Sequence, residues 1–343
     1  MYAIDLLKIV LLLIISALLA CCAGNRGNVF PLAEGYTLEG QVFARCRSLL
    51  ELDPALVRLN VIGFSGTENL PIYALDIGWE EAPREILIIG QHHGDEVLGV
   101  EIALGWAEEL ARGAGADKKI AAILDEYRFW IIPTINPEGY RVVSEGLYQH
   151  KRKNNRDTDG NGRLDLHSDG VDLNRNYPVF WDEDRVLPPT HQNYKGDAPA
   201  SEPEIRAVLA LAQKQDFELA IFYHSSPTGS LAEKIFLPAM DPKSAKQLKR
   251  YNSLIDFTRF YASNLKKDYT KGKYELSTIP GTRMGTARNY FFHIQETQAF
   301  LIETGGVNKD GISVIHPPAR KKDSIVSKHV KALRKVFHAT LSE

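Results

Sequence analysis

Cysteine is scarce in this chain of 343 residues, which contains three. Two of them, Cys21 and Cys22, stand side by side near the N-terminus, so Cys46 is alone in the rest of the sequence. A lone cysteine cannot form a disulfide within the chain or a cysteine-based metal site. Both kinds of site are therefore excluded from the body of the protein.

An excess of charge of one sign is also lacking. Lys and Arg together number 41 against 43 for Asp and Glu, which leaves a net charge of -2. No global electrostatic attraction therefore favours nucleic acid, and we expect no nucleic-acid partner. With 44% hydrophobic and 24% charged residues, the composition is that of an ordinary globular protein.

Internal repeats and long low-complexity segments are absent as well. The chain is long enough for one large α/β domain or two small ones. Without a repeat or a linker to divide it, one catalytic-size domain at 35–343 is the simplest organisation, and we expect a monomer.

Long apolar runs are confined to the N-terminus. Residues 9–20 carry no charge, and this run is too short to span a bilayer comfortably but suits the apolar region of a secretory signal. It ends in "LLAC", which resembles the lipobox of bacterial lipoproteins. That reading predicts a signal peptide at 1–20, lipid on Cys21 and a tether at 21–34.

The lipid would hold the protein at a membrane of the bacterial cell envelope, facing the periplasm or the exterior. A plain signal peptide or an N-terminal anchor helix is the alternative, because only Lys8 balances Asp5 before the apolar run.

Apolar runs and helical patterns alternate along the rest of the chain. "EILIIG" (85–90) is typical of a strand buried on both faces, and apolar residues at helical spacing over 97–111 predict a helix after it. The strand, helix and strand patterns recur later in "YRFWIIPTINPEGY", "SEPEIRAVLALAQKQ", "FELAIFYHS" and "TQAFLIETGG". We therefore predict an α/β fold with a mixed, mostly parallel twisted sheet and helices on both faces. The basic amphipathic segment 321–337 predicts a C-terminal helix docked on this sheet, with membrane binding as the alternative.

Three potential metal ligands follow predicted strands. "QHHGDEVLG" (91–99) contains two overlapping pairs, His92 with Asp95 and His93 with Glu96, and either pair alone is weak evidence. His224 in "YHS" adds a third candidate from another strand. Two histidines and one glutamate form an open zinc site of the hydrolytic type.

These motifs, in this order, resemble those of the zinc metallocarboxypeptidase family, the funnelins. The similarity covers most of the chain from about Leu49 to Gly305. The motifs that carry it are "NVIGFSGTENLPIYALDIG", "QHHGDE", "INPEGY", "RKNNR", "GVDLNRNYP", "YKGDAPASEPE", "YHS" and "FLIETGG". The resemblance implies an α/β/α sandwich, a Zn²⁺ cofactor and hydrolysis of C-terminal peptide bonds.

The resemblance also assigns roles to residues. It selects His93, Glu96 and His224 as zinc ligands and implies that Glu303 is the general base that activates a metal-bound water. Without it, His224 could be a core histidine and Glu303 could cap a strand end.

The family also has an arginine that stabilises the oxyanion. Arg152 and Arg156 are both candidates for it, because Asn155 stands where relatives commonly have arginine; as residues alone, both could belong to a solvated loop. The resemblance implies that Asn174 and Arg175 hold the terminal carboxylate of the substrate, which makes the enzyme an exopeptidase.

Two positions depart from the family pattern. Asp95 stands where many relatives have arginine, so we expect a substrate contact that those relatives make there to be missing. The tyrosine that closes over the substrate in the family has no clear counterpart, and Tyr290 is our candidate for it.

An acidic insertion separates the two arginine segments. In "DTDGNGRLDLHSD" (157–169), Asp157, Asp159, Asn161 and Asp165 take the first, third, fifth and ninth places of a calcium loop. The usual glutamate at the twelfth place is replaced by Ser168. We predict a Ca²⁺ site that braces this segment, with a solvated acidic turn as the alternative.

Our favoured function is therefore a membrane-tethered zinc carboxypeptidase acting on peptides, with peptidoglycan stem peptides and ordinary peptides equally eligible. A deacylase of the aspartoacylase or succinylglutamate-desuccinylase type is the first alternative, since it shares the metal motif. A catalytically silent peptide-binding module is the second alternative, although the predicted ligands and base are all present.

Overall fold

The computed structural model describes residues 32–239, 244–277, 281–312 and 314–342. The predicted signal peptide, Cys21 and most of the predicted tether lie outside these residues, so the lipoprotein prediction stays a prediction. Within the described ranges, no helix is both long enough and apolar enough to cross a membrane.

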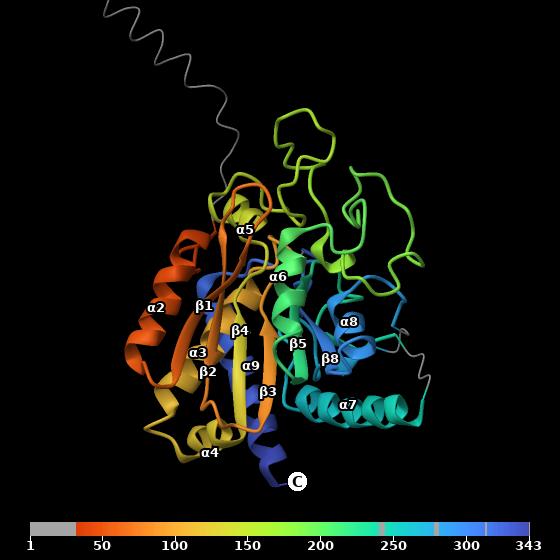
Figure 1. Cartoon of the computed structure of the whole chain (residues 1–343). Helices are drawn as coiled ribbons and strands as arrows, with labels where there is room; N and C mark the ends of the chain where they lie inside the picture. The colour runs from red at the N-terminus through yellow and green to blue at the C-terminus, as the bar shows by residue number, and fades with distance from the viewer. Residues whose placement is uncertain (1–31, 240–243, 278–280, 313, 343) are drawn as a thin grey trace, which may run out of the picture.

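One eight-stranded sheet runs through the described residues (Figure 1). Its strands lie side by side in the order β1-β2-β4-β3-β5-β8-β6-β7. The strands are β1 (Val57–Phe64), β2 (Pro71–Ile77), β3 (Arg84–Ile89), β4 (Tyr127–Ile132), β5 (Phe217–Ser226), β6 (Lys234–Phe236), β7 (Glu275–Leu276) and β8 (Gln298–Gly305).

The middle of the sheet is parallel, whereas antiparallel pairs lie toward both edges. β3 pairs in parallel with β4 and β5, and β5 pairs in parallel with β8. β2 is antiparallel to both of its neighbours, and β6 is antiparallel to β8. The predicted mixed, mostly parallel sheet is therefore confirmed.

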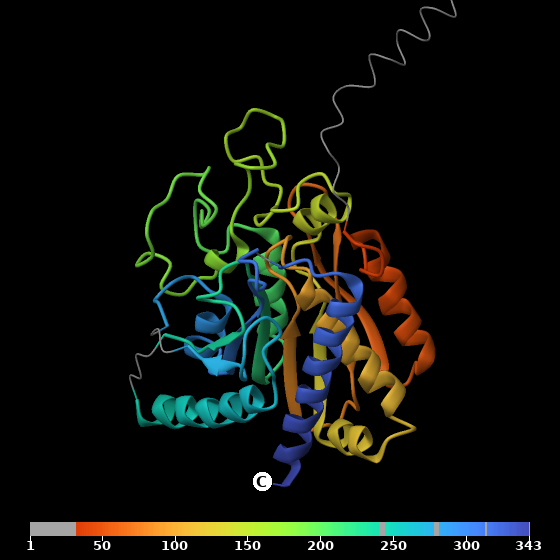
Figure 2. The same cartoon turned by 180° about the vertical axis from the view of Figure 1, so that it is seen from behind.

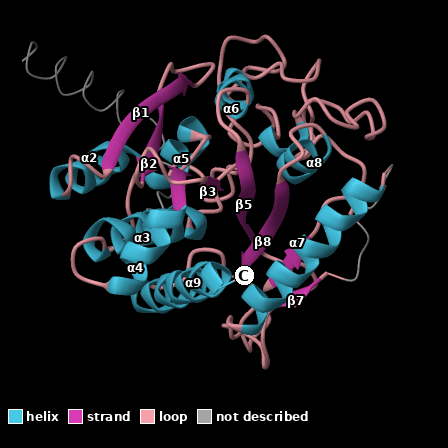
Figure 3. Cartoon of the chain, turned by 60° about the horizontal axis from the view of Figure 1, so that its bottom comes forward, coloured by secondary structure: helices cyan, strands magenta, loops and turns pink. Residues whose placement is uncertain are grey.

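Helices cover both faces of this sheet (Figure 3). The helices and short 3-10 turns (η) are η1 (Glu39–Gln41), α2 (Val42–Leu52), α3 (Leu98–Gly113), α4 (Lys118–Glu126), α5 (Pro137–Ser144), η2 (Leu173–Arg175), α6 (Pro203–Ala212), α7 (Ala245–Ser263), α8 (Ala287–His293), α9 (Ala319–Ala339) and η3 (Thr340–Ser342). α3 and α9 pack together on one face with α7 beside α9, and α6 and α8 lie on the other face (Figures 1 and 2). The predicted placement of helices on both faces is confirmed.

The C-terminal helix α9 docks on the domain, as predicted. Phe337 packs edge-on against Phe129 of β4, with their ring centroids 5.0 Å apart. In α3, a Cβ on Gly105 would lie 2.7 Å from a methyl group of Val326, so the missing side chain lets the two helices approach closely. α9 therefore lies beside α3 on the same face of the sheet and completes one layer (Figure 2).

The carboxyl ends of β3, β5 and β8 meet at one edge of the sheet, because the three strands are parallel neighbours. The long connection between α5 and α6 runs over this edge, at the top of Figure 1. In a sheet of this kind, functional side chains gather at the carboxyl ends of the strands. Three predicted site residues, His93, His224 and Glu303, lie at this edge.

Candidate metal centre and active site

The first two predicted ligands lie in the turn between β3 and α3. The backbone amide of Glu96 donates to the carbonyl of His93 at 3.0 Å, which closes the turn. At Gly94 a Cβ would lie 2.3 Å from the backbone of Gly139 in α5, so any side chain there would displace the turn. Glycine is therefore required for the position of both ligands.

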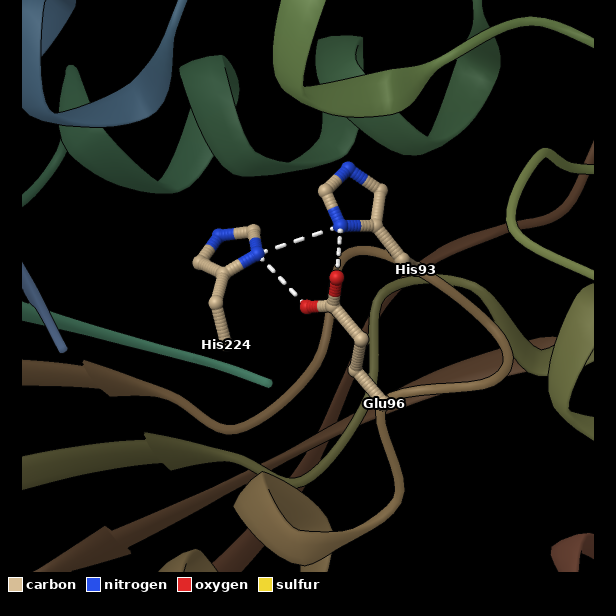
Figure 4. A group of neighbouring side chains, drawn as sticks. All are labelled: His93, Glu96 and His224. Carbon is tan, nitrogen blue, oxygen red and sulfur yellow. Dashed lines mark hydrogen bonds and ion pairs between the residues drawn. The ribbon is translucent and has the colours of Figure 1, made fainter. Parts of the chain in front are cut away.

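The side chains of His93, Glu96 and His224 converge on one point (Figure 4). Nδ1 of His93 lies 2.8 Å from Oε1 of Glu96, Nδ1 of His224 lies 2.7 Å from Oε2 of Glu96, and the two Nδ1 atoms are 3.1 Å apart. All three residues are buried. Two imidazole nitrogens and a carboxylate that face one another away from water are a donor set that fits zinc.

Asp172 fixes the ring of His93 from the side opposite Glu96. Its Oδ1 lies 3.0 Å from Nε2 of His93 and accepts the proton of that nitrogen, which leaves Nδ1 directed at Glu96. Asp172 is fully buried and also accepts hydrogen bonds from Arg152 (Nη2, 2.9 Å). We did not predict this residue, although it stands two positions before Asn174 in "GVDLNRN".

The charges of this cluster shift the pKa values of its members. Burial and Arg152 lower the pKa of His93, but Glu96 and Asp172 outweigh them and raise it to about 9. Burial lowers the pKa of His224 to about 4. A metal cation must displace the proton that these side chains hold between them. The affinity of the group for a metal should therefore rise with pH.

His224 is positioned by β5 and by its neighbours. The backbone amide of Ser225 donates to Oε2 of Glu96 at 3.1 Å, which ties the strand end to the second ligand. The ring of His92 stacks on His224 with centroids 5.2 Å apart, and the hydroxyl of Tyr177 lies 3.0 Å from Nε2 of His92. Burial lowers the pKa of His92 well below its usual value, so this ring packs in neutral form behind the metal group.

Glu303 lies beside His224 because the parallel strands β5 and β8 pair these two residues in register. Its Oε2 is buried and has no hydrogen-bond partner among the described residues. Burial, and then the charge of Glu96, raise the pKa of Glu303 to about 8. A cation in the metal group would lower this pKa, which favours the carboxylate that a general base requires.

The structure separates the two predicted arginines. Nη1 of Arg152 lies 3.4 Å from Oε1 of Glu96, so its guanidinium adjoins the metal group. The guanidinium of Arg156 instead pairs with Glu202 (2.9 Å) and Asp197. Of the two candidates, Arg152 is therefore the one that lies next to the predicted metal group.

Asn174 and Arg175 form the short turn η2 directly after Asp172. Nδ2 of Asn174 lies 3.2 Å from Nε2 of His224. In this contact the amide of Asn174 donates to Nε2, with the His224 proton on Nδ1. Nη1 of Arg175 donates to the carbonyl of Asn174 at 2.9 Å, and no ion pair joins Arg175 to a described carboxylate. The predicted carboxylate-binding pair thus adjoins the predicted metal group.

Tyr290 lies in α8 and is not brought to the metal group. Its hydroxyl accepts a hydrogen bond from Gln295 at 2.7 Å, and its ring packs against Tyr177 with centroids 5.8 Å apart. Gln295 precedes β8, whereas Glu303 lies near the other end of that strand. The placement of Tyr290 gives no support to a role in closing over the substrate.

Asp95 lies between the ligands in sequence but does not join them. Its backbone carbonyl accepts a hydrogen bond from Nε2 of His316 at 2.6 Å, and its Oδ1 is buried without a partner among the described residues. Burial, and then the charge of Glu96, raise the pKa of Asp95 to about 6. Its effect on substrate binding stays a prediction.

The acidic insertion gathers a different set of acids from the one we predicted. Carboxylates of Asp157, Asp159 and Asp169 lie within 4.8 Å of one another. The carboxylate of Asp165 instead accepts the amide of His167 at 3.0 Å. The side chain of Asn161, also predicted as a ligand, donates to Asp159 at 2.8 Å.

Comparison with known proteins agrees with this geometry. Residues 43–326 match the family model described as "Zinc carboxypeptidase". The chain is 28% identical to mast cell carboxypeptidase A of Mus musculus over 164 residues, which are 47% of this chain and 37% of that protein. It is 31% identical to carboxypeptidase D of Anas platyrhynchos over 177 residues, which are 50% of this chain and 11% of that protein. The matched part thus spans less than half the length of these curated relatives.

Solved structures show the same fold at lower identity. Carboxypeptidase A from Helicoverpa armigera superposes with a TM-score of 0.71 at 18% identity, covering 98% of this chain and 82% of that chain. Bovine thrombin-activatable fibrinolysis inhibitor, solved in complex with tick carboxypeptidase inhibitor, gives a TM-score of 0.70 at 19% identity, covering 90% of this chain and 97% of that chain.

Proposed function

Because the chain belongs to the zinc carboxypeptidase family, we propose that it is a zinc-dependent enzyme that removes the C-terminal residue of peptides. One observation carries the proposal. The buried group of His93, Glu96 and His224 lies beside Glu303, whose Oε2 has no partner among the described residues. A cation site next to a free carboxylate is the minimum that metal-assisted hydrolysis requires.

The chain's own residues divide the chemistry between them. Glu303 takes a proton from the attacking water and passes it to the leaving amine. Arg152, held by Asp172 next to Glu96, stabilises the negative charge that develops on the scissile carbonyl oxygen. The chemistry supplied by bound zinc is Lewis-acid catalysis together with a lower pKa for water.

Asn174 and Arg175 make the enzyme an exopeptidase in this proposal. A guanidinium binds a carboxylate through two parallel hydrogen bonds, and Arg175 has no ion pair with a described carboxylate. We propose that it binds the terminal carboxylate of the substrate. The residue that follows the cleaved bond would then be the last residue of the substrate, because its carboxylate is the group that Arg175 binds.

The site of action in this proposal is the bacterial cell envelope, with lipid on Cys21. In that location the substrates are peptidoglycan stem peptides or ordinary peptides, and both end in the carboxylate that Arg175 would bind. Recovery of the protein in the membrane fraction, and its release by Cys21→Ser, tests the lipid anchor. Equal solubility of both forms would contradict it.

The test of the reaction uses the purified, zinc-loaded protein on peptides, stem peptides and acyl-amino acids. We expect release of one C-terminal residue, loss of activity with a chelator and recovery with added zinc. Glu303→Gln should retain zinc but lose about 10²-fold or more in activity. Glu218→Gln is the matched control, because Glu218 lies on β5 at the end opposite His224 and pairs with Arg84.

The outcomes separate the alternative functions. Activity that survives both chelation and Glu303→Gln would contradict the zinc mechanism. Cleavage of acyl-amino acids alone would favour a deacylase, and zinc-dependent peptide binding without cleavage would favour a silent binding module.

Calcium in the acidic insertion remains a separate proposal. Asp157, Asp159 and Asp169 supply oxygen ligands of the kind that calcium prefers. Calorimetric titration with Ca²⁺ should give a signal that Asp159→Asn reduces. A titration without heat at millimolar Ca²⁺ would favour the solvated acidic turn.

A further inference from the structure

Arg288 is held next to the segment that carries Asn174 and Arg175. It is the second residue of α8, and the first residue, Ala287, donates its backbone amide to Oδ1 of Asn174 at 2.9 Å. This hydrogen bond joins segments 113 residues apart. The start of α8 is therefore fixed against the predicted carboxylate-binding turn.

The guanidinium of Arg288 is largely buried, and no anion among the described residues pairs with it. The residue is 9% exposed, its Nε has no hydrogen-bond partner, and no ion pair joins it to a described carboxylate. The guanidinium lies over the ring of Phe236, 5.9 Å from the ring centroid. Arg152, in contrast, is paired with Asp172 and Glu96. Burying a guanidinium without an anion is costly, so an unpaired one at a site edge indicates a ligand that brings the anion.

Arg175 and Glu303 are the charged groups that act on Arg288 most directly. Burial, and then the positive charge of Arg175, lower the pKa of Arg288 to about 10. The charge of Glu303 acts in the opposite direction but does not prevent this decrease. The cationic side chains of Arg175 and Arg288 thus lie near each other and near Glu303, the proposed base. Among the described residues, no carboxylate forms an ion pair with either arginine. This arrangement fits a ligand that carries two anionic groups.

We propose that Arg288 binds a side-chain carboxylate on the terminal residue of the substrate, so that the enzyme prefers peptides that end in glutamate or aspartate. The inference rests on the proposed function, in which Arg175 binds the main-chain carboxylate of the same residue. The second carboxylate then occupies the buried guanidinium, which can hold it through two parallel hydrogen bonds. A neutral or basic terminal side chain leaves Arg288 unpaired or repels it.

The test compares peptides that differ only in the last residue: Glu, Asp, Gln, Leu and Lys. We expect kcat/KM for the Glu peptide to exceed that for the Gln peptide by about 10- to 100-fold, the range of one charge-assisted hydrogen bond. Arg288→Gln should reduce this ratio to about one, and Arg288→Lys should retain part of it. Binding of the Glu and Gln peptides to Glu303→Gln, measured by calorimetry, gives the same comparison without turnover.

Arg250→Gln is the matched control. Arg250 is also largely buried with an unpartnered Nε, but it lies in α7 and pairs weakly with Glu296, at 3.9 Å. The Arg250→Gln variant should leave the ratio of kcat/KM between the Glu and Gln peptides unchanged.

The outcomes separate this inference from the proposed function. Release of Gln, Leu or Lys as fast as Glu by the unaltered enzyme, or an unchanged ratio in Arg288→Gln, would overturn the role of Arg288 and leave the carboxypeptidase proposal intact. Release of no residue from any peptide would contradict the carboxypeptidase proposal itself. If Arg288→Gln does not fold, the panel on the unaltered enzyme and the Arg288→Lys variant still decide the question.

Discussion

Replacing Asp172 by asparagine should weaken zinc binding without removing a ligand. Asp172 accepts four hydrogen bonds: from Nε2 of His93 (3.0 Å), from the backbone amide of Asn174 (2.9 Å), and from Nε (3.1 Å) and Nη2 (2.9 Å) of Arg152. An amide offers one acceptor oxygen in place of two, and its NH₂ group must then face a donor. Either Arg152 or His93 loses its partner in the variant.

The size of the effect follows from these contacts. Loss of a carboxylate behind a metal-bound histidine typically reduces metal affinity about 10- to 100-fold, which is about 1.4–2.7 kcal/mol. Breaking one side of a fully buried ion pair costs about 3–5 kcal/mol of folding stability. Because the Arg152 side chain is 23% exposed, we expect a smaller loss, about 2–3 kcal/mol.

The assay measures both quantities on metal-free protein at pH 7, with zinc affinity from competition with a chelator and stability from urea unfolding. Asp76→Asn is the matched control, because Asp76 is also buried and accepts four hydrogen bonds, from Arg58 and Arg128. It lies in β2, so it should lose stability but keep its zinc affinity. Unchanged affinity in Asp172→Asn would refute the positioning role, and an equal loss in Asp76→Asn would attribute the effect to general destabilisation.

Three further predictions concern activity and stability. Arg152→Lys should lower kcat about 10²-fold because the oxyanion loses its aligned donors, whereas Arg156→Gln should retain most activity; the reverse order would assign the role to Arg156. Burial raises the pKa of Glu204 from 4.5 to about 8, so the unfolded carboxyl ionises first and the folded state loses up to about 4 kcal/mol between these pH values. Urea unfolding of Glu204→Gln at pH 5 and pH 8 should lack this decrease, and equal pH dependence of both proteins would contradict the assignment. Gly99→Ala should destabilise the protein by about 1–3 kcal/mol, because its Cβ would lie 1.8 Å from the carbonyl oxygen of Gly90; unfolding at an unchanged urea concentration would count against that close approach.

The inner strands and the central helices were predictable because burial requires apolar residues in a recognisable pattern. A strand buried on both faces is an uninterrupted apolar run, and a helix buried on one face has apolar residues at helical spacing. The uninterrupted run at 85–90 became β3, whose residues from Ile86 onward are almost wholly buried. The helical spacing at 97–111 became α3. A strand covered on both faces admits few polar residues, so its position can be read locally.

The contacts that orient the site were less predictable. Asp172 and His93 are 79 residues apart, and the start of α8, which carries Arg288, is hydrogen-bonded to Asn174 across 113 residues. Such pairs leave no periodic pattern, since each depends on which loops the fold brings together. The family resemblance predicted the metal ligands, but it did not decide between Arg152 and Arg156 for the oxyanion. The partners of a loop arginine depend on the three-dimensional path of the loop, which the sequence does not show.

The pairing of His224 with Glu303 across β5 and β8 also determines which parts of this protein are free to change. The backbone spacing between His224 and Glu303 is that of two adjacent strands, about 4.8 Å, and the pairing of β5 with β8 sets it. Loops in the segment between these strands can therefore vary in length without altering this spacing, whereas β6 must be kept because it pairs with β8 at Glu303. Since α8 and Arg288 belong to that segment, a change there would alter the proposed substrate preference without moving the proposed base relative to His224.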